Sequence, residues 1–91
     1  MISIVHEDQN NRIAAYDGEE LIGVCEYAPS ASLWIASHTH VEDGYAGQGI
    51  GARMVKLLTE VAREQNKKIL PLCPYVKHVF DKTPEYEDLR A

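Results

Sequence analysis

The sequence predicts an α+β domain: a mostly antiparallel, curved sheet of about five strands, one main helix and a shorter C-terminal helix. Short apolar, β-branched segments separated by turn residues fill the first half of the chain. Apolar residues then recur with helical spacing over residues 50–65, which indicates an amphipathic helix. A strand before this helix and another after it add a parallel or splayed pair to the sheet. The length suits a single domain, residues 1–91.

The first four strands are expected at residues 2–5, 12–16, 21–27 and 33–41, as an antiparallel meander. Asp17 and Gly18 are a strong hairpin signal between the second and third segments. The third segment is apolar on both faces except at Glu26, so we expect the sheet to be covered on both sides. A break is expected at residues 28–30.

The second half of the chain predicts the helices and the last strand. The helix over residues 50–65 has one apolar face, made by Ile50, Met54, Leu57, Leu58 and Val61. Asn66 is expected to stop it in a left-handed conformation. Residues 69–73 read as a short strand, and Pro71 predicts a position near a sheet edge or a bulge. Residues 75–81 follow as the shorter helix, and residues 83–88 as a polar tail with a last turn.

Composition and charge argue against several classes of protein. The formal net charge of -5 disfavours a nucleic-acid-binding protein, which is usually basic. No apolar run approaches the roughly 18 residues of a membrane span. The first residues lack a basic segment followed by an apolar one, so we expect no secretory signal and a cytoplasmic protein. Cys25 and Cys73 have no zinc-binding spacing; free thiols are expected, although a disulfide between them stays open.

The glycine-rich stretch before the main helix is the strongest functional signal. Residues 47–52 read Gly-Gln-Gly-Ile-Gly-Ala, at the point where an apolar strand has ended and the helical pattern begins. A glycine turn leading into a helix leaves backbone N–H groups unpaired at the positive end of the helix dipole. Such a place binds phosphate, so the sequence predicts a site for a phosphorylated cofactor.

Two other nucleotide motifs fit this stretch poorly. Gly47, Gly49 and Ala52 formally satisfy the dinucleotide fingerprint, but that motif requires the glycines directly after the first strand of a parallel unit. It also requires an acidic residue about 20 positions on, and residues 67–73 contain none. A Walker loop would need Gly-Lys-Ser/Thr, which is absent.

The chain resembles the small, single-domain members of the GNAT acetyltransferases over roughly residues 10–90. Ala46-Gly47-Gln48-Gly49-Ile50-Gly51 aligns with their acyl-CoA loop at two glycines and departs from it at Ala46, where a basic or amide residue is usual. Three further segments appear in the family's order: Ser37-His38-Thr39-His40-Val41, Lys68-Ile69-Leu70-Pro71-Leu72-Cys73-Pro74-Tyr75-Val76, and Thr83-Pro84-Glu85-Tyr86.

The resemblance implies a compact acetyl-CoA-binding fold with splayed strands. The pantetheine chain would pair with backbone near Val41, and the thioester would point towards the end of the strand at residues 69–73. The diphosphate would bind the N–H groups of Gly47, Gln48, Gly49, Ile50, Gly51 and Ala52. The chain is too short for the elements that wall the acceptor pocket of larger acetyltransferases. An open acceptor side is therefore expected, for an amine on a protein, a peptide or a small molecule.

The candidate catalytic residues are Cys73, His38 and Tyr75. Cys73 could accept the acetyl group itself as a thiolate, or be a small buried residue at a strand end. His38 could be the general base, or a hydrogen-bonded strand histidine. Tyr75 could donate a proton to the departing thiolate, or only pack. His38 and His40 lack spacing support for further ligands, so we expect no metal site.

Three other residues carry weaker expectations. Cys25 and Trp34 are expected in the core, and Glu26 is either an edge-facing carboxylate or a buried acid near the acceptor. Three functions therefore remain: an acetyl-CoA-dependent N-acetyltransferase, with direct transfer or an acetyl-Cys73 intermediate; a module that binds CoA or acyl-CoA without catalysis; and an interaction domain whose glycine loop is only a tight turn.

Overall fold

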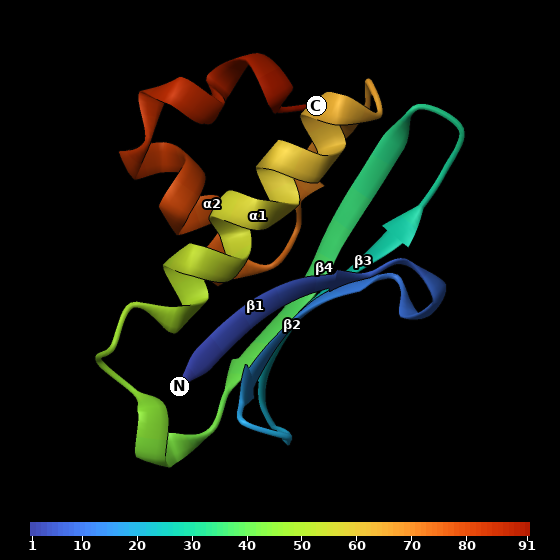
Figure 1. Cartoon of the computed structure of the whole chain (residues 1–91). Helices are drawn as coiled ribbons and strands as arrows, with labels where there is room; N and C mark the ends of the chain where they lie inside the picture. The colour runs from blue at the N-terminus through green and yellow to red at the C-terminus, as the bar shows by residue number, and fades with distance from the viewer.

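The computed structural model describes residues 1–91 and contains one five-stranded sheet with two α-helices (Figure 1). The strands are β1 (Ile2–Glu7), β2 (Arg12–Asp17), β3 (Glu20–Pro29), β4 (Leu33–Val41) and β5 (Lys68–Pro71). The helices are α1 (Ile50–Glu64) and α2 (Pro74–Lys82), and three 3₁₀ turns are η1 (Asp8–Asn10), η2 (Asp43–Tyr45) and η3 (Pro84–Leu89). The predicted fold class is confirmed.

The strands follow chain order across the sheet, and only the last pair is parallel. The long helix α1 connects the two parallel strands, as such a pair requires. Pairing between β4 and β5 covers only residues 33–36 and 68–71. The last hydrogen bond between this end of β4 and the chain after β5 is donated by the Cys73 amide to the Ala36 carbonyl oxygen at 2.9 Å. Beyond it, residues 38–41 of β4 pair only with β3, and β4 and β5 splay apart.

Most element boundaries agree with the sequence, and the differences lie at strand ends. Gly18 and Asn66 both have positive φ, as the predicted hairpin and helix stop require. β3 continues to Pro29 without the expected break, because residues 27–29 still pair with β4. The last strand ends at Pro71, two residues early, because Cys73 becomes the N-cap of α2. β5 is an edge strand of the sheet, as Pro71 predicted.

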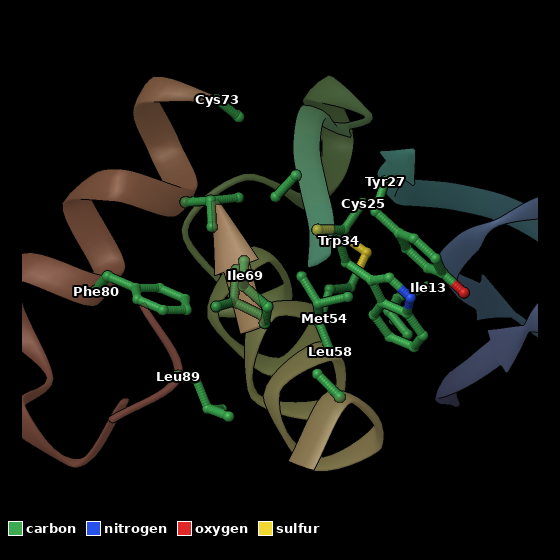
Figure 2. Close-up of a cluster of buried hydrophobic side chains, with 14 of the residues drawn as sticks. Ile13, Cys25, Tyr27, Trp34, Met54, Leu58, Ile69, Cys73, Phe80 and Leu89 are labelled. Atoms are coloured by element: carbon green, nitrogen blue, oxygen red, sulfur yellow. The ribbon is translucent and has the colours of Figure 1, made fainter. Parts of the chain in front are cut away.

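The core lies between the sheet and the helices. Met54, Leu58 and Ala62 of α1 are fully buried. Figure 2 shows most of the side chains of this cluster, with Ile69 of β5 between α1 and Phe80 of α2. Cys25 and Trp34 belong to this core, as expected. The expectation that both faces of the sheet are covered was wrong. α1 crosses one face and α2 packs at the β5 edge, so no helix covers the other face of β1, β2 and β3 (Figure 1).

Candidate active site

The turn before α1 presents a row of unpaired backbone N–H groups. Gly47 and Gly49 have φ of 82° and 75°, left-handed conformations that glycine adopts without strain. Gly49 is the N-cap of α1, and no side chain caps the helix. The helix hydrogen bonds begin with the Arg53 amide, which donates to the Gly49 carbonyl oxygen at 3.0 Å. The amides of residues 47–52 make no hydrogen bond within the protein, so they are free to bind an anion.

A cavity of about 420 Å³ adjoins this turn where β4 and β5 splay apart. It is lined by Thr39, His40, Val41, Tyr45, Ala46, Gly47, Gly49, Ile50, Gly51 and Tyr75. Five of the predicted cofactor-binding residues are therefore at the cavity: Val41, Gly47, Gly49, Ile50 and Gly51. Gln48 and Ala52 belong to the turn and the first turn of α1 but do not line the cavity.

Tyr45 fixes the wall of the cavity next to the glycine turn. Its hydroxyl donates to Asp17 Oδ2 at 2.6 Å, which joins η2 to the hairpin between β2 and β3. This hydrogen bond, more than burial, raises the pKa of Tyr45 to about 12. It also contributes most to lowering the pKa of Asp17, so the pair stays a phenol and a carboxylate across the physiological range. The wall is thereby held by an interaction that neutral pH does not disturb.

Tyr75 closes the cavity from the α2 side by lying against the first turn of α1. A Cβ atom placed on Gly51 would come within 2.8 Å of the Tyr75 hydroxyl and within 2.9 Å of two ring carbons. Glycine at position 51 is therefore needed for the close approach of the ring, and not for an unusual backbone angle. Burial raises the pKa of Tyr75, so the phenol remains a proton donor at neutral pH.

We expect Gly51→Ala to change stability with opposite signs in two backgrounds. With Tyr75 present, the new methyl group collides with the ring, and the free energy of unfolding should fall by about 1 kcal/mol. In a Tyr75→Ala background the collision is gone, and the better helix propensity of alanine should raise it by about 1 kcal/mol. A double-mutant cycle in urea measures the coupling. Additive effects would mean that the ring does not lie on α1.

Cys73 sits where β5 gives way to α2, close to the splayed end of the sheet (Figure 2). Its side chain is buried, and its thiol donates to Thr39 Oγ1, with 3.5 Å between sulfur and oxygen. Burial opposes ionisation, but it is outweighed by hydrogen bonds from Thr39 and from the backbone amides at the start of α2. The pKa of the Cys73 thiol is therefore lowered. Because Thr39 lines the cavity, this thiol lies directly behind the cavity wall.

The two cysteines should differ sharply in reactivity. Burial raises the pKa of Cys25 to about 11, so at pH 8 roughly one Cys25 in a thousand is a thiolate. We expect iodoacetamide at pH 8 to modify Cys73 at least about 100 times faster than Cys25 in the native protein. Peptide mass spectrometry after timed quenching measures both rates. Equal rates in native protein would contradict this arrangement, and equal rates in urea are the control.

His38 lies on β4 as predicted, but the structure does not bring it to the cavity. It is exposed and faces Glu26 across the β3–β4 ladder, whereas the next residue, Thr39, faces Cys25 in the core. Since side chains alternate along a strand, His38 and Thr39 point to opposite faces of the sheet. Its role as general base stays a prediction, for an amine that approaches from the open face. Glu26 is half-buried on that same face.

Two residues at the site were not assigned a function from the sequence. Thr39 joins the cavity to Cys73, and Tyr45 braces the turn. Thr39 stands inside the His-Thr-x-Val segment, but strict alternation from Trp34 and Ala36 puts it on the face opposite the core, so no signal in the sequence points to its role. Nothing in the sequence pairs Tyr45 with Asp17, 28 positions earlier. No group of three or more His, Cys, Asp or Glu side chains is placed to hold a metal ion.

The family model of GCN5-related N-acetyl-transferases matches residues 12–89. The chain is also similar to a GCN5-like protein of Staphylococcus aureus whose proposed activity is N-acetyl transfer. That structure, solved by NMR, is 28% identical with a TM-score of 0.77, over 98% of this chain and 87% of the other. This chain therefore belongs to the family of GCN5-related N-acetyl-transferases, whose members typically use acetyl-CoA. No curated protein matches it.

Larger proteins share the fold. The ribosomal-protein-alanine N-acetyltransferase of Brucella melitensis is 20% identical with a TM-score of 0.60, over 88% of this chain and 60% of that one. A transcriptional regulator of Bacillus halodurans is 26% identical with a TM-score of 0.58, over 91% and 60%. This chain thus spans about three fifths of both proteins. No helix in it is long and apolar enough to cross a membrane.

Proposed function

We propose that residues 1–91 form a single domain that transfers an acetyl group from acetyl-CoA to an amine. One observation supports this most strongly: a single cavity has residues with unpaired amides in its lining and, behind Thr39 at its wall, a thiol with a lowered pKa. The amides suit the diphosphate of CoA, and the thiol lies where the thioester would end. Both cysteines are free, which suits a reducing compartment such as the cytoplasm.

The donor side of the proposed site uses backbone groups. The N–H groups of residues 47–52 would hold the diphosphate through charge-assisted hydrogen bonds and the helix dipole. This backbone anion-binding site does not need the basic or amide side chain that is usual in the family at the position of Ala46. The free edge of β4 near Val41 would pair with the amide groups of the pantetheine chain, as an added strand pairs with a sheet edge.

The transfer would follow one of two routes. In the covalent route the Cys73 thiolate attacks the acetyl carbonyl carbon, and the C–S bond to CoA breaks as the CoA sulfur leaves with the electron pair. The amine nitrogen then attacks the acetyl-cysteine, restores the Cys73 thiolate and loses a proton. In the direct route the amine attacks the thioester itself. In both, Tyr75 would protonate the leaving sulfur of CoA. His38 would take the proton of an amine that approaches from the open face of the sheet.

Ligand binding tests the donor before any acceptor is known. CoA and acetyl-CoA should raise the melting temperature in a thermal-shift screen, because a ligand that binds only the native state stabilises it. Longer acyl-CoAs in the same screen measure chain preference. Calorimetry that detects no heat with millimolar CoA would overturn the proposal and leave the glycine loop as a tight turn in an interaction domain.

A second candidate function is a module that binds CoA or acyl-CoA without catalysis. The position of His38 favours it, because no histidine or carboxylate general base other than the exposed His40 lines the cavity. His40 is itself paired with Glu42 at 3.1 Å. Release of CoA thiol from acetyl-CoA with a panel of protein, peptide and polyamine amines separates the two. Binding without amine-dependent release would support the module.

A further inference from the structure

The proposed chemistry uses one thiol and leaves the other unexplained. Cys25 is fully buried on β3, and a valine or alanine would fill such a position as well. It is nevertheless in hydrogen-bonding contact. Thr39 Oγ1 donates to the Cys25 sulfur at 3.7 Å, while the same oxygen accepts from the Cys73 thiol at 3.5 Å. One hydroxyl therefore lies between the only two cysteines of the chain.

The three groups form a chain with a direction. With both cysteines as thiols, the Cys73 S–H donates to Thr39, and the Thr39 O–H donates to Cys25. A threonine hydroxyl has one hydrogen to donate and two lone pairs to accept with. Once Cys73 has lost its proton it can only accept, so the existing arrangement would leave two acceptors, Cys73 and Thr39, facing each other.

We infer that Cys25, Thr39 and Cys73 form a hydrogen-bond relay that reverses when Cys73 ionises, with Thr39 as the positioning residue of the Cys73 thiolate. In the reversed state Cys25 donates its S–H to Thr39, and Thr39 donates its O–H to the Cys73 thiolate. No proton moves between residues; each hydrogen only rotates about its own C–O or C–S bond. The inference rests on the proposed function in one respect, that the Cys73 thiolate is the species that reacts.

Cys25 suits the donor end of this relay. Burial raises its pKa to about 11, so it keeps its hydrogen throughout the range in which Cys73 ionises. The backbone amides at the start of α2 supply the remaining donors to the Cys73 sulfur. The other titratable group near Cys73 is Tyr75 on α2. On β4, His38 points to the opposite face of the sheet, and His40, which lines the cavity, is exposed and paired with Glu42. The residues of α1 that belong to the same hydrophobic core, Met54 and Val55 among them, carry no titratable group.

The pH dependence of Cys73 alkylation tests the relay without any acetyl-CoA. Thr39→Val keeps the side-chain volume and removes the hydroxyl, so the midpoint of the iodoacetamide rate profile should move to higher pH. The rate at pH 7 should fall about tenfold, as expected for one lost hydrogen bond to an anion. Thr39→Ser keeps the hydroxyl and should stay within about twofold of the unaltered protein. Peptide mass spectrometry assigns the label to Cys73.

Cys25 provides a second, independent pair of variants. Cys25→Ser keeps a donor to Thr39 and should leave the Cys73 profile nearly unchanged. Cys25→Ala removes the donor and should slow Cys73 alkylation at pH 7 about threefold. Circular dichroism establishes that each variant is folded. Profiles of folded Thr39→Val and Thr39→Ser that coincide, or a Cys25→Ala profile identical to that of Cys25→Ser, would overturn the relay.

The failure of the relay can be told from the failure of the proposed function. If the alkylation profiles move as expected but CoA does not bind, the relay holds and the acetyltransferase proposal fails. If CoA binds and acetyl transfer proceeds while the profiles do not move, the enzyme proposal holds and the relay fails. Turnover of Thr39→Val connects the relay to the proposed acetyl transfer. Its kcat should fall in proportion to the thiolate fraction of Cys73, while its KM for acetyl-CoA stays within about twofold.

Discussion

Replacing Cys73 by serine should lower acetyl transfer at least about 100-fold and leave the affinity for CoA within about twofold. The thiol contributes a nucleophile whose pKa is lowered, because Thr39 and the start of α2 stabilise the thiolate. A serine hydroxyl in the same place has no adjacent base that could activate it. The proposed diphosphate site consists of backbone amides of residues 47–52 and does not use the Cys73 side chain, so binding should not change.

Three measurements check this expectation. Thiol release with an amine panel gives kcat, calorimetry gives the dissociation constant of CoA, and intact mass after mixing with acetyl-CoA detects an acetyl adduct. Cys25→Ser is the matched control, since it alters the other thiol without changing Cys73. An adduct that disappears in Cys73→Ser supports the covalent route. Turnover retained in Cys73→Ser, with no adduct in the unaltered protein, would instead assign the reaction to direct attack by the amine.

The sequence predicts the architecture well where the pattern repeats over many residues. The helical spacing of Ile50, Met54, Leu58 and their neighbours gives the whole of α1, whose observed end lies one residue before the predicted one. Gly18 and Asn66 are residue types that tolerate a positive φ, and they predict the hairpin turn and the end of the helix. These signals are local, and a local pattern does not need the tertiary structure in order to be interpreted.

The orientation of β4 is where prediction from sequence fails, and the cause is a bulge. Trp34 and Ala36 face the core, and strict alternation would put His38 on the same side. The register with β3 shifts at this point: Tyr27 faces Ala36 and Glu26 faces His38, so Ser37 has no partner. One extra residue moves Thr39 to the core side and His38 to the open side. The bulge is set by pairing with β3 and leaves no mark on the pattern of β4.

The covering of the sheet could not be predicted for a related reason. The apolar residues of β3 predict a sheet covered on both faces, but Val24 is only half-buried on a face that has no helix. Ala14 of β2, which lies between Val5 and Val24, is fully buried on that face without any helix above it. Composition alone does not separate side chains shielded by cross-strand neighbours from those shielded by another layer.

Gly49→Asp should reduce CoA affinity at least about 100-fold at low salt. Aspartate is among the residues that tolerate a φ of 75°, and a Cβ at this position meets no atom within 4 Å, so the variant should fold with a stability loss of about 1 kcal/mol. Its carboxylate would lie among the free amides of residues 47–52. There it would both compete for their hydrogen bonds and repel the two charges of a diphosphate.

Comparison with Gly49→Asn separates the effect of the negative charge on CoA affinity from the effect of the side chain's size. Asparagine has nearly the same volume and the same tolerance of the left-handed conformation, so steric loss and strain are shared by both variants. The difference between them, about tenfold, is the electrostatic part, and it should shrink as ionic strength rises from 0.01 to 0.5 M because salt screens exposed charges. Calorimetric titration of both variants with CoA at the two salt concentrations measures it. Equal affinities for the two variants at low salt would mean that the diphosphate does not bind at this turn. Stability measured in urea would then distinguish a displaced ligand from a damaged helix start.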